Sequence, residues 1–377
     1  MRILDRYVLR QFLRSFLICF LSLAGLYVVF DAFTNLEDFI ACAQKQGTHL
    51  LALIGSYYSF QTLLFFDRTS GLMTLIAAMF TVSWLQRHNE IVAMQSAGIS
   101  RVRVVAPIIA AAVVLSACSA ASREMVIPRF HRELSQRPRD LTSGQELAPR
   151  YDNRTDVLIR GKAAFADEKR ISEPDFLLPP ALDRYGKQLM AEDAFYKPAE
   201  SGRPGGYLLA GVTLPEQLGT RPTLTLGNEP VVITPRDAPD WLRPDQCFLV
   251  SELTFEQLTA GSTWRQLSST YDLISGLQND ALGFGADVRV AIHARMVRPL
   301  LDVTLLFLGL PLVLTRQSRN VFIAMGLCAL VVSVFSMVVI GFQYLGTVYS
   351  VTPVLAAWAP LLIFVPVAVA AADSMWQ

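Results

Sequence analysis

The sequence predicts an α+β membrane protein in which six transmembrane helices carry an all-β domain inserted between helices 3 and 4. Three observations support this fold class. The chain has 377 residues, is 52% hydrophobic and has a mean hydropathy of +0.37, which is too apolar for an ordinary globular protein. Six stretches of about 17–22 residues carry few charges, and each is long enough to cross a bilayer. Between the third and fourth stretch, the sequence becomes richer in prolines, glycines and charged residues and contains short runs typical of β-strands.

The six apolar stretches divide into two groups of three. They lie near 15–33, 69–86, 104–122, 297–315, 320–341 and 353–372. We expect the first to be no cleavable signal peptide, because its apolar run is too long. Residues 48–66 are also apolar, but joined to 69–86 they would give a span of about 35 residues, well beyond the ~20 that a bilayer needs. We therefore expect Asp67 and Arg68 to mark the outer mouth, with 48–66 as a separate helix on or near the outer surface.

Basic residues in the short loops predict how the helices are oriented. Arginines lie before span 1, between spans 2 and 3, and between spans 4 and 5: Arg2, Arg6, Arg10, Arg14, Arg87, Arg101, Arg103, Arg316 and Arg319. The opposite short loops hold only Lys45 in 34–50 and no basic residue in 342–352. Both termini are therefore expected in the cytoplasm, and the long central segment outside.

The chain is expected to divide into three parts. Residues 1–122 would hold transmembrane helices 1–3, residues 123–295 the β domain with a helical return, and residues 296–377 helices 4–6. Strand candidates are 156–160, 188–196, 207–212, 223–226, 231–234 and 247–250. Their interruption by Gly, Pro, Asn and Asp favours a β-sandwich or roll over βαβ units. Residues 253–258 and 270–296 are predicted to be helical and to lead the chain back to the bilayer.

A short polar stretch between spans 2 and 3, residues 86–101, predicts a cytoplasmic segment that we call the handle. Asn89 can cap a helix N-terminus, Glu90 favours the positive end of that helix, and Gly98 is the residue type that best closes a C-terminus. Ser100 can cap the next helix. About two turns of helix near 87–98 would then be joined tightly to both spans, so force on the handle should reach both. An ordinary capped loop is the alternative.

Motifs for enzyme chemistry are missing from the sequence. It has no GxxxxGK[ST] phosphate loop, no GxSxG elbow and no HExxH zinc motif, and its four histidines are dispersed. We therefore expect no cofactor, no metal and no catalytic residue, and ATP hydrolysis would belong to another chain. Cys42 and Cys247 would both face an oxidising compartment, where a disulfide is possible. The favoured interpretation is that both stay unpaired and pack as small hydrophobic residues.

Ionisable residues at membrane depth form the second candidate site, because burying one in hydrocarbon costs at least about 2.5–3.5 kcal/mol. Asp302 follows Arg298 by one turn, so the two side chains could face each other. Arg68 and Arg298, with Lys45 or Arg123, could meet the anionic groups of a lipid headgroup. Interfacial charges that reach out to water are the alternative.

Several of these residues resemble a known family. Its signature is carried here by Asn89-Glu90 and the following Ala97-Gly98-Ile99-Ser100, and the likeness extends to Asp5-Arg6-Tyr7, to Arg295 with Pro299, and to Ala-Ala-Trp at 356–358. The chain resembles the lipopolysaccharide-export permeases of the LptF/LptG type. The resemblance implies a non-catalytic subunit of an ATP-binding-cassette exporter in the bacterial inner membrane, with cytoplasmic termini and a periplasmic β-jellyroll. It would extract lipopolysaccharide or a related glycolipid.

The resemblance also implies partners and residue roles. The partners would be a cytoplasmic ATPase dimer of the LptB type, a homologous LptF/LptG-type permease subunit, a single-span periplasmic bridge protein of the LptC type, and lipopolysaccharide; no nucleic acid is expected. Glu90 would pair with an arginine of the ATPase, and the other coupling residues would be Arg87, Ile91, Val92, Met94 and Gly98. Spans 1 and 5 would enclose the lipid, with acyl-chain contacts from Phe30, Phe33, Phe335 and Phe342. Asp31, Glu37 and Asp38 depart from the family, whose members place basic residues there.

Two other functions remain compatible with the sequence. The first is a membrane-anchored periplasmic binding or scaffold protein without transport activity, and the second is an integral-membrane enzyme that acts on lipid headgroups. The sequence is equally compatible with an F-like or a G-like subunit, and with a homodimer or a heterodimer.

Overall fold

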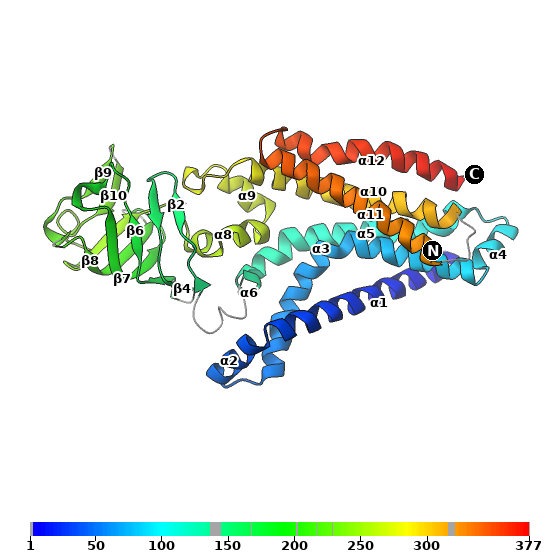
Figure 1. Cartoon of the computed structure of the whole chain (residues 1–377), viewed down its shortest axis with the longest axis horizontal. Coiled ribbons are helices and arrows are strands. Elements are labelled where there is room, and N and C mark those ends of the chain that lie inside the picture. Colours follow the sequence, from blue (N-terminus) through cyan, green and yellow to red (C-terminus); the bar gives the residue numbers. More distant parts are fainter. Residues whose placement is uncertain are drawn as a thin grey trace. The chain divides into compact units, whose positions relative to one another are not determined.

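The computed structural model describes most of the chain. The described residues are 3–135, 145–166, 168–200, 203–216, 218–227, 229–315 and 321–376. They form two compact units (Figure 1). The first unit comprises Met1–Thr34, Ser56–Phe130 and Gly285–Gln377, and the second comprises Asn35–Gly55 and His131–Phe284.

The first unit is built from long apolar helices. They are α1 (Ile3–Thr34), α3 (Leu50–Arg87), α5 (Arg101–Ala121), α10 (Ala286–Thr315), α11 (Val321–Thr347) and α12 (Pro353–Trp376). α5 continues through the short turns η1 (Ser122–Val126) and η2 (Ile127–Phe130). Within the described residues, six helices are long and apolar enough to cross a membrane. The β domain follows the third of them, which confirms the predicted fold class. Of the residues used for orientation, Arg2, Arg316 and Arg319 lie outside the described residues.

One helix boundary was predicted wrongly. α3 runs unbroken over 38 residues through Asp67 and Arg68, so 48–66 is no separate helix. The reason is that Asp67 finds cationic partners inside the bundle and need not reach water, and the sequence around it offers no proline to stop the helix.

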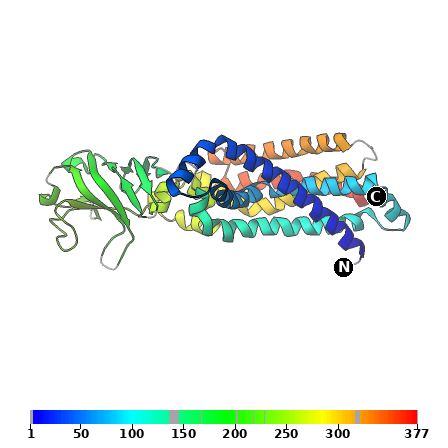
Figure 2. The ribbon, with the colours of Figure 1, turned by 90° about the horizontal axis from the view of Figure 1, so that it is seen from below.

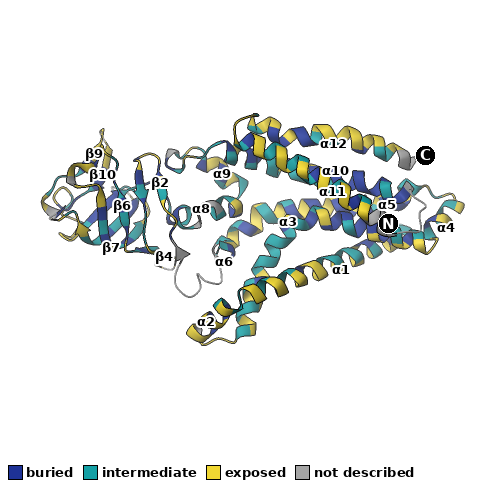
Figure 3. Ribbon diagram, in the orientation of Figure 1, coloured by how far each residue is buried: buried dark blue, intermediate teal, exposed yellow. Residues whose placement is uncertain are grey.

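The core of this unit lies among α3, α5 and α10, which carry most of the unit's buried residues, dark blue in Figure 3. α5, α10 and α12 run alongside one another in both views (Figures 1 and 2). α1 and α11 differ: only 11% of the most apolar stretch of each is buried, against 61% for α10. Most of the apolar side chains in these stretches therefore face outward from the chain.

The second unit contains an antiparallel sheet. Its strands are β1 (Gln145–Glu146), β2 (Arg150–Asp152), β3 (Val157–Ile159), β4 (Ala163–Phe165), β5 (Arg170–Ser172), β6 (Asp175–Leu177), β7 (Gln188–Lys197), β8 (Gly206–Leu214), β9 (Leu224–Leu226), β10 (Glu229–Ile233) and β11 (Gln246–Val250). The main order is β1-β4-β5-β7-β8-β11-β10-β9, and β2 joins through β3 and β6 to β7. Each predicted strand is present, and the unpredicted β1, β2, β4, β5 and β6 are three residues long or shorter.

Short helices complete the second unit: α2 (Leu36–Gln46), α6 (His131–Ser135), α8 (Phe255–Leu267) and α9 (Thr270–Gly276). A capping box of Thr254 and Gln257 starts α8. The stretch predicted as helical at 270–296 is divided between α9 and α10, because the chain breaks around Gly283, whose φ of +53° leaves the helical region. Cys42 and Cys247 are both buried and free, as the favoured interpretation expected.

Candidate functional sites

The handle folds as the short helix α4 (Glu90–Ser96), and its C-terminal end is closed as predicted. Gly98 adopts φ +79°, its N–H donates to Gln95 O at 2.9 Å, and the Ile99 N–H donates to Met94 O at 3.0 Å. These two bonds are the Schellman motif, which stops a helix at a left-handed residue. The Ser100 side chain then accepts the N–H of Arg103 and caps α5, which confirms the second predicted cap.

The start of α4 differs from the prediction. Asn89 lies in the left-handed region at φ +57°, and its side chain makes no capping hydrogen bond. Its N–H donates to Gln86 O at 3.0 Å, so the residue reverses the chain after α3. Asparagine tolerates this conformation better than most residues, which is why it suits the turn although it does not cap α4.

Glu90 is held from α1. The hydroxyl of Tyr7 donates to its carboxylate and lies 2.9 Å from Oε1 and 2.8 Å from Oε2. A second contact lies beyond the handle, where Nη2 of Arg103 is 3.1 Å from both carboxylate oxygens of Asp5. The chain start, the chain end and α4 all lie at the same end of the membrane unit (Figures 1 and 2).

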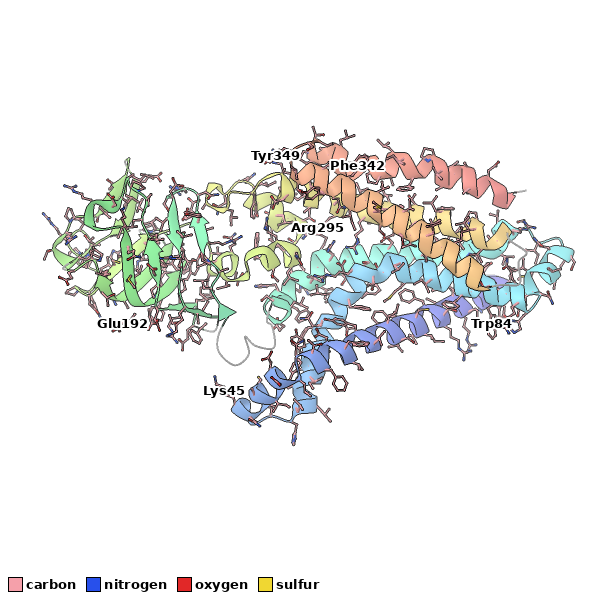
Figure 4. The ribbon with its side chains drawn as sticks, viewed as in Figure 1. Lys45, Trp84, Glu192, Arg295, Phe342 and Tyr349 are labelled. Carbon is pink, nitrogen blue, oxygen red and sulfur yellow. The ribbon has the colours of Figure 1, made fainter. Side chains whose placement is uncertain are left out.

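The other predicted coupling residues fall into two groups. Arg87 and Gly98 are exposed, whereas Ile91 is only 6% exposed and belongs to the buried cluster of the membrane unit, against which Met94 packs. Ile91 thus fixes the handle to its own bundle. The exposed apolar side chain of α4 is Val92, which is 61% exposed. Trp84, near the end of α3 (Figure 4), adds a half-exposed ring that packs on His88.

A buried charge cluster lies in the membrane unit, where α3, η1 and α10 meet. Asp67 is 2% exposed, and its Oδ2 lies 2.9 Å from Nη2 of Arg123 and 3.5 Å from Nη1 of Arg298. Arg298 also donates to the Asp67 carbonyl, and Ser119 donates to Oδ1 at 3.5 Å. Ser70 in turn donates to Ser119 at 3.0 Å. One carboxylate therefore joins three segments of the bundle.

The arrangement of Arg298 and Asp302 differs in part from the expectation that they face each other. The ion pair of Arg298 runs to Asp67 on α3. Asp302 lies against Gly71, where a Cβ would collide with its Oδ1, and next to Ser116 of α5. Glycine at position 71 is what allows this close approach.

The remaining predicted lipid residues lie in different surroundings. Arg68 and Lys45 are exposed, and Lys45 belongs to the second unit. Phe30 and Phe33 on α1 are 67% and 74% exposed. Phe335 is only 6% exposed, because its ring packs on Phe364 of α12 at a centroid distance of 4.8 Å, so it is not available to an acyl chain in this arrangement.

Phe342 is half-buried on α11 (Figure 4), and Arg295 on α10 lies in the same unit. On span 1, Asp31 is not a free acidic group, because Tyr58 of α3 donates to it at 2.6 Å. The acidic residue that the sequence marked as a departure from the family is thus part of the contact between α1 and α3.

One cavity was not predicted. It measures about 310 Å³ and lies between α3 and α11, with a mostly apolar lining. The lining residues are Leu72, Leu75, Ile76, Met79, Phe80, Ser83, Cys328, Ala329, Val332 and Ser333. Because the two helices are far apart in sequence, no local pattern could have revealed it. Within the ranges that the structure describes, no group of three or more His, Cys, Asp or Glu side chains could hold a metal ion.

Comparison with known proteins identifies the family. The chain matches a family model described as "Lipopolysaccharide export system permease LptF/LptG" over residues 6–172 and 197–372. Among curated proteins, none matches the chain. The matched residues include the handle and the buried charge cluster, and they confirm the resemblance seen in the sequence. The chain therefore belongs to the lipopolysaccharide export system permease LptF/LptG family.

Proposed function

We propose that this chain is the permease subunit of an ATP-binding-cassette exporter that extracts lipopolysaccharide, or a related glycolipid, from the inner membrane. It would pass the lipid to a periplasmic bridge protein of the LptC type. A separate LptB-type ATPase dimer would supply the energy, and a second LptF/LptG-type subunit would complete the membrane part. Membership of a lipopolysaccharide export permease family supports this proposal.

The orientation in the proposal follows from charge and from the position of the handle. Arg87, Arg101 and Arg103 flank α4, and arginines near short loops favour the cytoplasmic side. Both chain ends lie at the same end of the membrane unit as α4 (Figure 1), so they would share the cytoplasm with it. The β domain would then be periplasmic. The division at 1–122, 123–295 and 296–377 stays a prediction.

The observation that carries the proposal is the geometry of the handle. A capped helix of seven residues presents Glu90 beside an exposed Val92, while Ile91 fixes it to the bundle. An exposed ion pair contributes only about 0–1 kcal/mol, so Glu90 must be largely covered by the ATPase for the contact to hold. An apolar neighbour such as Val92 would help to exclude water from that pair.

The lipid would lie along the exposed apolar face of α1. Phe30 and Phe33 are well exposed there, and the cavity between α3 and α11 provides further apolar surface within the membrane unit. Arg68 is an exposed cation for the lipid phosphates. Arg298 would contribute only if its pairing with Asp67 changes.

Copurification tests the proposal most directly. The detergent-solubilised chain is purified from its native membrane as wild type and as Glu90→Arg. We expect an ATPase to copurify with the wild type and to be lost from the variant, because the reversed charge repels the cation that Glu90 pairs with. Glu37→Arg is the matched control, since this exposed glutamate lies on α2, outside the handle.

Two results would count against the exporter. If no ATPase accompanies the wild type, the proposed energy source is missing, and a membrane-anchored scaffold becomes the better description. If Glu90→Arg retains the ATPase as well as the wild type does, the handle is not the docking site.

A further inference from the structure

The beginning of α1 makes one contact with the handle, at the start of α4, and a second contact just beyond the handle, at the start of α5. At the entry, the hydroxyl of Tyr7 meets both carboxylate oxygens of Glu90, the first residue of α4, at 2.9 and 2.8 Å. At the exit, both oxygens of Asp5 lie 3.1 Å from Arg103 in the first turn of α5. Two residues of α1 that are two positions apart therefore bracket the seven-residue helix.

Apolar packing supports the same junction. Val8 and Phe12 of α1 are both 0% exposed, and they belong to one buried cluster with Ile91 of α4 and with Val104 of α5. The polar contacts thus lie beside a packed base that fixes the distance between α1 and the handle. Without this apolar packing, an exposed ion pair would contribute little to the stability of the junction, because its side chains are free to move into water.

The contact leaves Glu90 able to bind something else. An ionised carboxylate offers about four acceptor sites, and the Tyr7 hydroxyl has one proton to donate. Because that hydroxyl is nearly equidistant from Oε1 and Oε2, it fixes the direction of the carboxylate while acceptor sites remain for a cation. Glu90 is itself partly exposed, so the carboxylate is approachable from outside.

We infer that Tyr7 and Asp5 are positioning residues that tie α1 to the handle and to the first turn of α5 beside it, so that a displacement of the handle moves α1 together with α3 and α5. The covalent chain joins the handle only to α3 and α5. The two contacts add α1, a helix with a largely outward apolar face. Along its length α1 exposes Leu17, Leu21 and Phe30 by 57%, 59% and 67%. The inference rests on the proposed function, because it assumes that a partner moves the handle.

The test separates docking from coupling. The full chain is purified with its copurifying ATPase and reconstituted into vesicles that contain lipopolysaccharide. Tyr7→Phe keeps the ring and removes the hydroxyl. We expect the amount of bound ATPase and the rate of ATP hydrolysis to stay within about twofold of wild type, while lipopolysaccharide extracted per ATP falls at least fivefold. Tyr27→Phe is the matched control on the same helix, because its ring stacks on Phe65 and lies away from the handle.

A charge exchange provides the second variant. Asp5→Arg and Arg103→Asp should each lower the amount of lipid extracted per ATP, and the double variant should restore it, because the pair is remade with its charges reversed. Restoration shows that the two residues act as an ion pair, and lipid extracted per ATP is a readout that a change in the amount of folded complex alone would not move. Restoration also shows that the complex folds with the changed residues.

Three results would overturn the inference. They are an unchanged extraction per ATP in Tyr7→Phe, a loss of ATPase binding in that variant, and a double charge exchange that fails to restore extraction. A wild-type complex that captures no ATPase or moves no lipopolysaccharide contradicts the proposed function itself. That result appears before any variant is compared, so the two failures are distinguishable.

Discussion

Removing the carboxylate of Asp67 should destabilise the membrane unit strongly. In Asp67→Asn the side chain keeps its shape, but Arg123 and Arg298 lose the anion that lies 2.9 and 3.5 Å from them. Removing one partner of a buried ion pair costs about 3–5 kcal/mol, because the other charge stays buried without compensation. The two arginine side chains are 21% and 29% exposed and regain part of their hydration, so we expect about 2–3 kcal/mol here.

The assay is thermal unfolding of the detergent-solubilised chain, followed by an environment-sensitive thiol probe. Asp67→Asn should unfold at a clearly lower temperature than wild type. Ser119→Ala is the matched control, since it removes only neutral hydrogen bonds, the long one to the same carboxylate and the one that Ser70 donates, and should cost about 1–2 kcal/mol, less than the loss of the carboxylate. An unfolding temperature equal to that of wild type in Asp67→Asn would refute the view that this carboxylate holds three segments together.

Three further predictions concern the handle and the β domain. Gly98→Ala places a side chain at φ +79° with open space around it, so backbone strain of about 1–2 kcal/mol should loosen the handle and lower ATPase copurification several-fold. Tyr207→Phe removes the buried hydroxyl that donates to Leu253 O at 3.0 Å, and should lower the unfolding free energy of the β domain by about 1–3 kcal/mol in chemical denaturation. The Thr223 N–H, with its hydroxyl, lowers the pKa of Asp237, so this carboxylate stabilises the fold above its unfolded pKa and the stabilisation is lost as pH falls through the folded pKa. Asp237→Asn should therefore flatten the acid limb of the stability profile, and an unchanged profile would contradict this.

Local signals explain what the sequence could predict. The handle was predictable because Gly98 and Ser100 act within one turn of their own position, and the membrane helices because their apolar runs match a bilayer. Asn89 was misread because asparagine suits both a helix cap and a left-handed turn, and only the path of the chain between α3 and α4 decides between them.

Long-range contacts explain what the sequence could not predict. Asp67 and Arg298 are 231 positions apart, so the sequence around either residue did not indicate that the aspartate would form ion pairs and be buried within α3. The same holds for Phe335, whose aromatic partner Phe364 lies on another helix. The short strands β4, β5 and β6 have too few residues to show an alternating pattern.

The burial of Ile91 has an entropic consequence for binding. A free peptide of seven residues is far shorter than the ~12–15 residues that a helix needs in water, so α4 would be unfolded without its surroundings. Ordering seven free residues would cost on the order of 10 kcal/mol. Here the buried side chain and the left-handed glycine have already ordered the segment within the folded chain. A docking protein therefore meets a preorganised helix, and nearly all of the contact energy is available for affinity.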